Sequence, residues 1–112
     1  MALLSLQTYE DREEVRLALS GELDLSSAVL FDEELRRIEE RKHPNVLLLD
    51  LRSLKFVDST GLRLILNAHQ RAVKAGRKLR ILQGAPVKRI FRLTGVFERL
   101  DIVDDAAARP SG

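Results

Sequence analysis

The sequence predicts an α/β fold, in which a small mixed sheet of four to five strands is flanked by helices in a single domain. Residues 4–9 and 15–20 alternate between apolar and polar side chains, a pattern typical of half-buried strands. A continuous apolar run at 46–49 indicates a strand buried on both faces. Apolar residues recur at helical spacing between and after these segments. Strands that alternate with helices imply that the later strands of the sheet are parallel.

The first two strands are predicted to form an antiparallel hairpin with a charged turn at residues 10–13. The motif Gly21-Glu22-Leu23-Asp24 (GELD) follows and is predicted as a loop, after which a helix begins near Ser26 or Ser27. Acidic residues precede basic ones along this helix, which predicts the (i, i+4) ion pairs Asp32–Arg36 and Glu33–Arg37. The buried stripe of the helix is predicted to be Ala28, Phe31, Leu35 and Ile38.

The central segment is predicted to be a strand, a turn and a helix. After the apolar run the chain crosses residues 52–57, predicted as a loop, and reaches Asp58-Ser59-Thr60-Gly61 (DSTG). The second helix ends near Ala75 and Gly76, and Gly76 suits the first position beyond it. Its apolar stripe is Leu62, Ile65, Leu66, His69, Ala72 and Val73, which Leu64, Ala68 and Ala75 widen to one side. Either another helix, for which the third is a candidate, covers that flank, or the flank binds a protein.

The last third of the chain adds a strand at 79–82, a helix and a short final strand at 100–103. Pro86 suits the first position of the helix, and Gly95 ends it. Residues 104–108 allow one more helical turn, and residues 109–112 are predicted to be a frayed tail. The predicted element order is therefore β-β-α-β-α-β-α-β, and residues 1–112 are predicted to form one domain.

The composition is typical of soluble globular proteins, with 45 % hydrophobic and 32 % charged residues. The absence of cysteine excludes disulfides and thiolate metal sites. The first residues lack the basic stretch of a signal peptide, and no apolar run approaches the length of a membrane span. We therefore expect a cytoplasmic protein with no membrane partner.

Nucleic-acid binding is weakly supported, because 19 basic side chains stand against 17 acidic ones and give a net charge of +2. Basic groups at 77–80 and 88–92 are the best argument for it. The helices beside these groups are separated by a strand, which is not a helix-turn-helix arrangement. Aromatic residues make up 4 %, which argues against a stacking platform for single strands. We expect no direct nucleic-acid contact.

No group of residues predicts an active site, a metal site or a cofactor. His43 stands at a break between helix and strand, and His69, inside an apolar stripe, is expected to be a satisfied core residue. Asp50 and Asp58 are separated by a predicted loop, so paired-carboxylate catalysis has no further support. Neither a glycine-rich phosphate loop nor a nucleophile elbow occurs. We expect a protein that is not an enzyme.

Ser59 stands at the predicted start of the second helix, where two interpretations remain open. Asp and Ser are favoured N-cap residues and precede many helices with no other role. The first N–H groups of a helix lack internal partners and the helix dipole is positive there, so a phosphate on Ser59 would be tolerated. Spacing alone does not decide between a cap and a modification site.

Three motifs occur in order along the chain: GELD at 21–24, FVDSTGL at 56–62 and PVKRIFRLTGVF at 86–97. Together they resemble the STAS domain, specifically the stand-alone bacterial anti-sigma factor antagonists, over about residues 4–103. The resemblance implies that the unphosphorylated form binds an anti-sigma factor serine kinase and so releases a sigma factor. It also implies that the kinase, which supplies ATP and Mg, phosphorylates Ser59 and ends the binding, and that a serine phosphatase reverses the modification. Relatives commonly carry a fuller C-terminal helix than residues 104–108 can supply.

The partner-binding residues expected from this resemblance and from the apolar flank are Glu22, Asp24, Asp58, Ser59, Thr60, Gly61 and Leu64. Asp24 can also act as a cap of the first helix. Because both motif loops lead from a strand into a helix, we expect them to share one edge of the sheet. The alternative function is that of a STAS subunit in a larger assembly, such as a stressosome or a lipid transporter.

Overall fold

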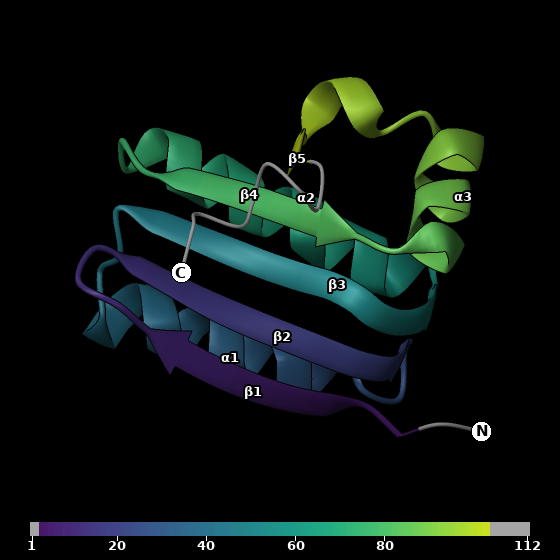
Figure 1. Cartoon of the computed structure of the whole chain (residues 1–112), viewed down its shortest axis with the longest axis horizontal. Coiled ribbons are helices and arrows are strands. Elements are labelled where there is room, and N and C mark those ends of the chain that lie inside the picture. Colours follow the sequence, from purple (N-terminus) through teal and green to yellow (C-terminus); the bar gives the residue numbers. More distant parts are fainter. Residues whose placement is uncertain (1–2, 104–112) are drawn as a thin grey trace.

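The computed structural model describes residues 3–103, which form a five-stranded sheet with helices (Figure 1). The elements are β1 (Ser5–Glu10), β2 (Glu14–Leu23), α1 (Ala28–Arg41), β3 (Val46–Val57), α2 (Ser59–Lys74), β4 (Lys78–Gln83), α3 (Ala85–Thr94), the short 3-10 helix η1 (Phe97–Arg99) and β5 (Asp101–Val103). This order confirms the prediction. The helical turn at 104–108 and the tail at 109–112 lie outside the described residues.

The sheet follows chain order, β1-β2-β3-β4-β5, and is mixed as predicted. β1 and β2 form the antiparallel hairpin, with a register that runs from Ser5↔Ser20 to Glu10↔Val15. The pairs β2–β3, β3–β4 and β4–β5 are parallel. β2, β3 and β4 precede α1, α2 and α3. Because these three strands are parallel, their carboxyl ends all lie at the same end of the sheet.

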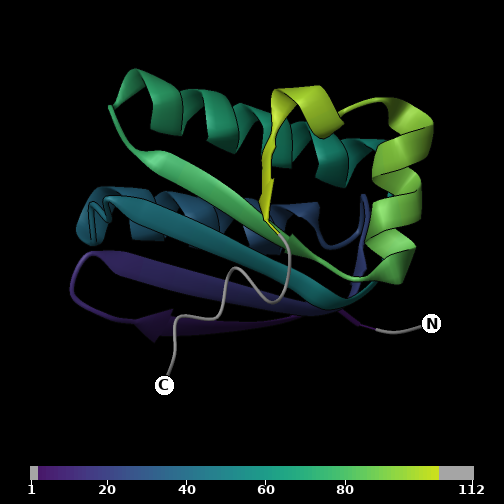
Figure 2. The ribbon, with the colours of Figure 1, turned by 45° about the horizontal axis from the view of Figure 1, so that its top comes forward.

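Helices α1 and α2 lie side by side on one face of the sheet, and α3 stands at the end where β4 finishes (Figures 1 and 2). The predicted inner stripe of α1 is confirmed in full. Fully buried side chains from each layer meet in one core, including Leu17 of β2, Phe31 of α1, Leu49 of β3 and Ile65 of α2. Burial of each such side chain contributes roughly 1.5–3 kcal/mol, so the core fixes the position of both helices on the sheet.

Two segments predicted as loops, residues 21–23 of GELD and residues 52–57, are instead paired strand. Residues 21–23 end β2 and residues 52–57 end β3. The pairs are Ser20↔Ser53, Gly21↔Leu54, Glu22↔Phe56 and Leu23↔Val57. The register shifts twice in this stretch, and residues 52–57 of β3 do not alternate regularly between buried and exposed positions, the pattern by which a strand is recognised in a sequence. The longer strands carry the chain almost directly to the starts of α1 and α2.

The apolar flank of α2 faces α1, because Arg71 of α2 makes two hydrogen bonds of 2.8 Å to the carboxylate of Glu39 on α1. Leu64, Ala68 and Ala75 share this side of the helix with Arg71. Ala68 is buried, Leu64 is half-buried against the core and Ala75 is exposed at the helix end. The third helix was the candidate to cover this flank, but α1 occupies that place.

Finer predictions for the helices had mixed outcomes. The Asp32–Arg36 pair forms at 3.6 Å. Arg37, however, pairs with Glu34 at 2.6 Å, so the prediction of a Glu33–Arg37 pair is wrong. His69 is half-buried, and its Nδ1 is buried without a hydrogen-bond partner among residues 3–103, so it is not the satisfied core residue that was expected.

Candidate functional site

Ser59 is the first residue of α2, and its side chain is exposed. The cap of the helix is Asp58, whose extended backbone (φ −96°, ψ −176°) lets its Oδ1 accept a hydrogen bond of 2.9 Å from the Gly61 N–H. The hydroxyl of Ser59 makes no hydrogen bond within the described part of the chain. The capping role therefore belongs to Asp58, and the serine is left accessible.

Asp58 also joins the two motifs to each other. Its Oδ2 accepts a hydrogen bond of 3.0 Å from the N–H of Leu25, 33 residues away, directly after GELD. Its own N–H donates to the carbonyl oxygen of Leu23 at 3.0 Å. The expectation that the two strand-to-helix loops share one edge of the sheet is confirmed. One carboxylate holds both loops in a fixed relation.

Gly61 allows α2 to approach the sheet closely. A Cβ on this residue would lie 2.7 Å from Leu23 Cγ and 2.9 Å from Val57 Cγ2, closer than real side chains pack. Gly61 is buried and Thr60 is half-buried, so the glycine positions Ser59 and presents no surface of its own. The sequence interpretation named Gly61 as a partner contact and missed this role. Glycine lowers the stability of a helix, so a glycine in the first turn of α2 was the sequence signal for a packing role.

Asp24 organises the turn that leads into α1. Its Oδ1 accepts hydrogen bonds from the Ser26 hydroxyl (2.6 Å), the Ser26 N–H (3.0 Å) and the Ser27 N–H (3.3 Å). The N-cap of α1 is Ser27, so Asp24 caps the preceding turn and not the helix itself. The hydrogen bond from the Ser26 hydroxyl, helped by these N–H groups, holds the pKa of Asp24 below its ordinary value. Asp24 is therefore ionised at neutral pH.

Exposed apolar side chains surround the joined loops. Leu25, Val29, Leu30 and Phe56 are between 43 % and 74 % exposed. A shallow hollow of about 250 Å³ lies beside them, lined by Leu3, Leu4, Glu22, Asp24, Ser26, Ser27 and Leu30. We call the set Glu22, Asp24, Leu25, Phe56, Asp58 and Ser59 the loop surface. Exposed apolar groups beside carboxylates are typical of a protein contact site.

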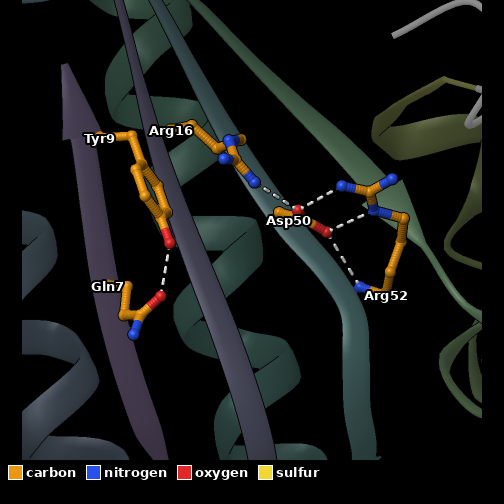
Figure 3. A network of polar contacts seen from close by, with 5 residues as sticks. All are labelled: Gln7, Tyr9, Arg16, Asp50 and Arg52. Carbon is orange, nitrogen blue, oxygen red and sulfur yellow. Dashed lines mark hydrogen bonds and ion pairs between the residues drawn. The ribbon is translucent and has the colours of Figure 1, made fainter. Parts of the chain in front are cut away.

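A second polar cluster lies on the sheet face opposite α1 and α2 (Figure 3). The carboxylate of Asp50, 6 % exposed, accepts hydrogen bonds from Arg52 Nε (2.8 Å), Arg52 Nη2 (2.7 Å) and Arg16 Nη1 (2.9 Å). The Arg16 guanidinium carbon lies 4.2 Å from the centre of the Tyr9 ring, and the Tyr9 hydroxyl donates to Gln7.

The role of this cluster is to pair a buried charge. Burial works to raise the pKa of Asp50, but the hydrogen bonds from Arg52 and Arg16 outweigh it and hold the pKa below its ordinary value. Sequence reasoning missed the cluster because Arg16 lies 34 residues from Asp50. Nothing in this arrangement resembles an acid and base pair for catalysis.

Two negative observations hold for residues 3–103. They contain no group of three His, Asp or Glu side chains placed to hold a metal ion. No helix in that range is long and apolar enough to cross a membrane.

Comparisons with known proteins identify a family through its model and a fold through solved structures. The family model of the STAS domain matches residues 5–108. An anti-sigma F factor antagonist of Paenibacillus polymyxa is 26 % identical over 103 residues, which cover 91 % of this chain and 88 % of that protein. The crystal structure of an anti-sigma factor antagonist from Mycobacterium paratuberculosis matches with a TM-score of 0.81 at 19 % identity, over 89 % of this chain and 85 % of that one. The Bacillus cell fate determinant SpoIIAA in its phosphorylated form matches with a TM-score of 0.70 at 21 % identity, over 93 % and 96 % of the two chains.

Proposed function

The chain belongs to the STAS domain family, and from that premise we propose that it is an anti-sigma factor antagonist. Its unphosphorylated form binds an anti-sigma factor serine kinase through the loop surface and so frees a sigma factor. The kinase supplies ATP and Mg and phosphorylates Ser59, and a serine phosphatase restores the first form. The chain itself is a binding module in the cytoplasm, with no catalysis and no cofactor of its own.

The observation that carries this proposal is the placement of Ser59. It is an exposed hydroxyl on a helix start that Asp58 caps and ties to the GELD segment. The exposed Leu30 and the ionised Asp24 line the same shallow hollow. The similarity to an anti-sigma F factor antagonist along most of the chain supports the same function.

In the unphosphorylated form, the small Ser59 side chain lets a partner pack closely over the joined loops. Leu25 and Phe56 supply apolar area, which drives association at roughly 25 cal/mol per Å² removed from water. Glu22 and Asp24 supply negative charge and so favour a partner that carries basic side chains. The fixed relation between the loops means that little ordering is required on this side of the interface.

Phosphorylation ends the binding through local charge and size. A phosphate adds about −1.5 to −2 charges at neutral pH, beside the carboxylate of Asp58. That carboxylate is held by two N–H groups and cannot turn away. Burial of the phosphate against the partner without a matched cation costs desolvation energy. The helix start tolerates the charge, so the fold is kept while the partner is released.

Affinity capture from the native cell, followed by measurement with the purified partner, tests the proposal. Recovery of a histidine-kinase-like ATPase that binds the unmodified chain in calorimetry supports it. Recovery of transporter subunits in its place would contradict the proposal and favour a subunit of a larger assembly. Incubation with that ATPase, ATP and Mg should place phosphate on Ser59, as read by peptide mapping.

Serine variants sharpen this test. Ser59→Ala should keep partner binding and lose phosphorylation, whereas Ser59→Asp should weaken binding, although a carboxylate carries less charge than a phosphate. Ser53→Ala is the matched control, because Ser53 is also exposed but lies within β3. Phosphate found mainly on Thr60 or Ser53, or an Asp variant that binds as tightly as wild type, would refute the proposed switch.

A further inference from the structure

Arg63 lies on the exposed side of α2, one helical turn beyond Ser59. Residues four apart in a helix have Cβ atoms roughly 5–6 Å apart, so the long Arg63 side chain reaches the space around Ser59. Residues 59–74 include no acidic residue, so Arg63 has no carboxylate to pair with on its own helix. It makes no ion pair or hydrogen bond within residues 3–103. Arg63 is thus an accessible cation without a partner in the described part of the chain.

Three of the backbone donors near Ser59 are occupied already. The Gly61 N–H bonds Asp58 Oδ1, the Leu62 N–H bonds the Asp58 carbonyl oxygen and the Leu25 N–H bonds Asp58 Oδ2. A phosphate on Ser59 is therefore left with the N–H groups of Ser59 and Thr60, the first two of the helix, as backbone donors. It also meets the carboxylate of Asp58 next to it. A side-chain cation is needed to balance its charge, and Arg63 is placed to supply it.

We propose that Arg63 binds the phosphate of phosphorylated Ser59 within the same chain. This inference rests on the proposed function, which supplies the phosphate. A guanidinium group presents paired N–H donors whose geometry matches the oxygens of a phosphate. The pair adds a phosphate to the loop surface and holds the Arg63 guanidinium group beside it. A partner with basic side chains then gains little by approaching the phosphate, because the nearest cation already belongs to this chain.

The test uses chain with phosphoserine placed at position 59 during synthesis, so that no kinase is involved. The second pKa of the phosphate, about 6 for an isolated phosphoserine, is followed by phosphorus NMR. Arg63 favours the dianion and lowers this pKa, whereas the neighbouring Asp58 raises it. Arg63→Gln should therefore raise the pKa by about 0.3, the size expected for an (i, i+4) pair. In wild type, the Nε–H signal of Arg63 should move as the phosphate ionises.

Lys74→Gln is the matched control, since Lys74 is another exposed cation of α2 but lies in its last turn. This variant should leave the phosphate pKa unchanged, and Arg63→Lys should keep part of the wild-type lowering. The inference would be overturned if the phosphate pKa were the same in wild type and Arg63→Gln. It would also be overturned if the Nε–H signal of Arg63 did not shift as the phosphate ionises. Such a result would not contradict the proposed binding of a partner. Conversely, failure of a kinase to modify Ser59 would contradict the proposed function but not the Arg63–phosphate pair.

Discussion

Substitution of Asp58 by asparagine should break one of the two bonds that its carboxylate makes and spare the other. An asparagine side chain has one acceptor oxygen and one NH₂ group. With the oxygen facing the Gly61 N–H, the helix cap is kept. The NH₂ group then faces the N–H of Leu25, and two donors meet. Asp58→Asn therefore removes the hydrogen bond between the side chain and the Leu25 N–H but keeps the helix cap.

The size of the effect follows from the lost contacts. A hydrogen bond to a charged acceptor contributes about 1.5–3 kcal/mol, but Leu25 is 74 % exposed, and water replaces part of that loss. We expect Asp58→Asn to lower the free energy of unfolding by about 1 kcal/mol. Asp58→Ala also loses the cap, which contributes about 1 kcal/mol, so its cost should be about 2 kcal/mol.

Amide hydrogen exchange followed by NMR, combined with urea unfolding, checks both the place and the size of the effect. In Asp58→Asn, the Leu25 N–H should exchange faster while the Gly61 N–H stays protected. In Asp58→Ala, both should exchange faster. Asp11→Asn in the hairpin turn is the control and should change stability by less than about 0.5 kcal/mol. An unchanged Leu25 N–H in Asp58→Asn would refute the role assigned to Asp58 in joining the loops.

Three further predictions follow from the described contacts. Gly61→Ala should lower the free energy of unfolding by about 1–3 kcal/mol in urea, because its Cβ would collide with Leu23 and Val57; wild-type stability would contradict the packing role. Because the pKa of Asp50 is lowered in the fold, its ionic contribution is present above about pH 4 and is lost as the pH falls through the lowered pKa. The difference in free energy of unfolding between wild type and Asp50→Asn should therefore decrease from pH 7 to pH 3. A constant difference would argue against an ionic contribution of Asp50. Asp24→Asn keeps an acceptor for the turn but removes the charge, so calorimetry should show weaker binding of the anti-sigma factor with little change in stability; normal binding would move the interface elsewhere.

The helices were the part of the fold most open to prediction. Four apolar residues at helical spacing fixed the inner face of α1, and every one of them is buried. Gly76 and Gly95 both adopt positive φ beyond helix ends, where a residue without Cβ is favoured. The continuous apolar run at 46–49 likewise indicated the central strand, since such runs occur where both faces are covered.

The missed features depend on residues far apart in the chain. The carboxyl-terminal halves of β2 and β3 pair with shifted register, and the second half of β3 does not show the alternation of a regular strand. The DSTG motif placed the helix start correctly, but the bond from the Leu25 N–H to Asp58 and the contact of Gly61 with Leu23 exist only after the sheet has formed. The contact of Arg16 with Asp50 is likewise a product of strand pairing.

The sequential strand order has a consequence for how the molecule is made. Each strand pairs with the one immediately before it in the chain, from β1 through to β5. A nascent chain that emerges amino-terminal end first can therefore add each new strand to an edge that already exists, and no strand must wait for a later one to complete its pairing. Sequence-local pairing of this kind lowers the loop-closure cost of each step and favours rapid folding. Asp58 emerges when the carbonyl oxygen of Leu23 and the N–H of Leu25 are already available, so the proposed switch site can be assembled before β4, α3 and β5 have been synthesised.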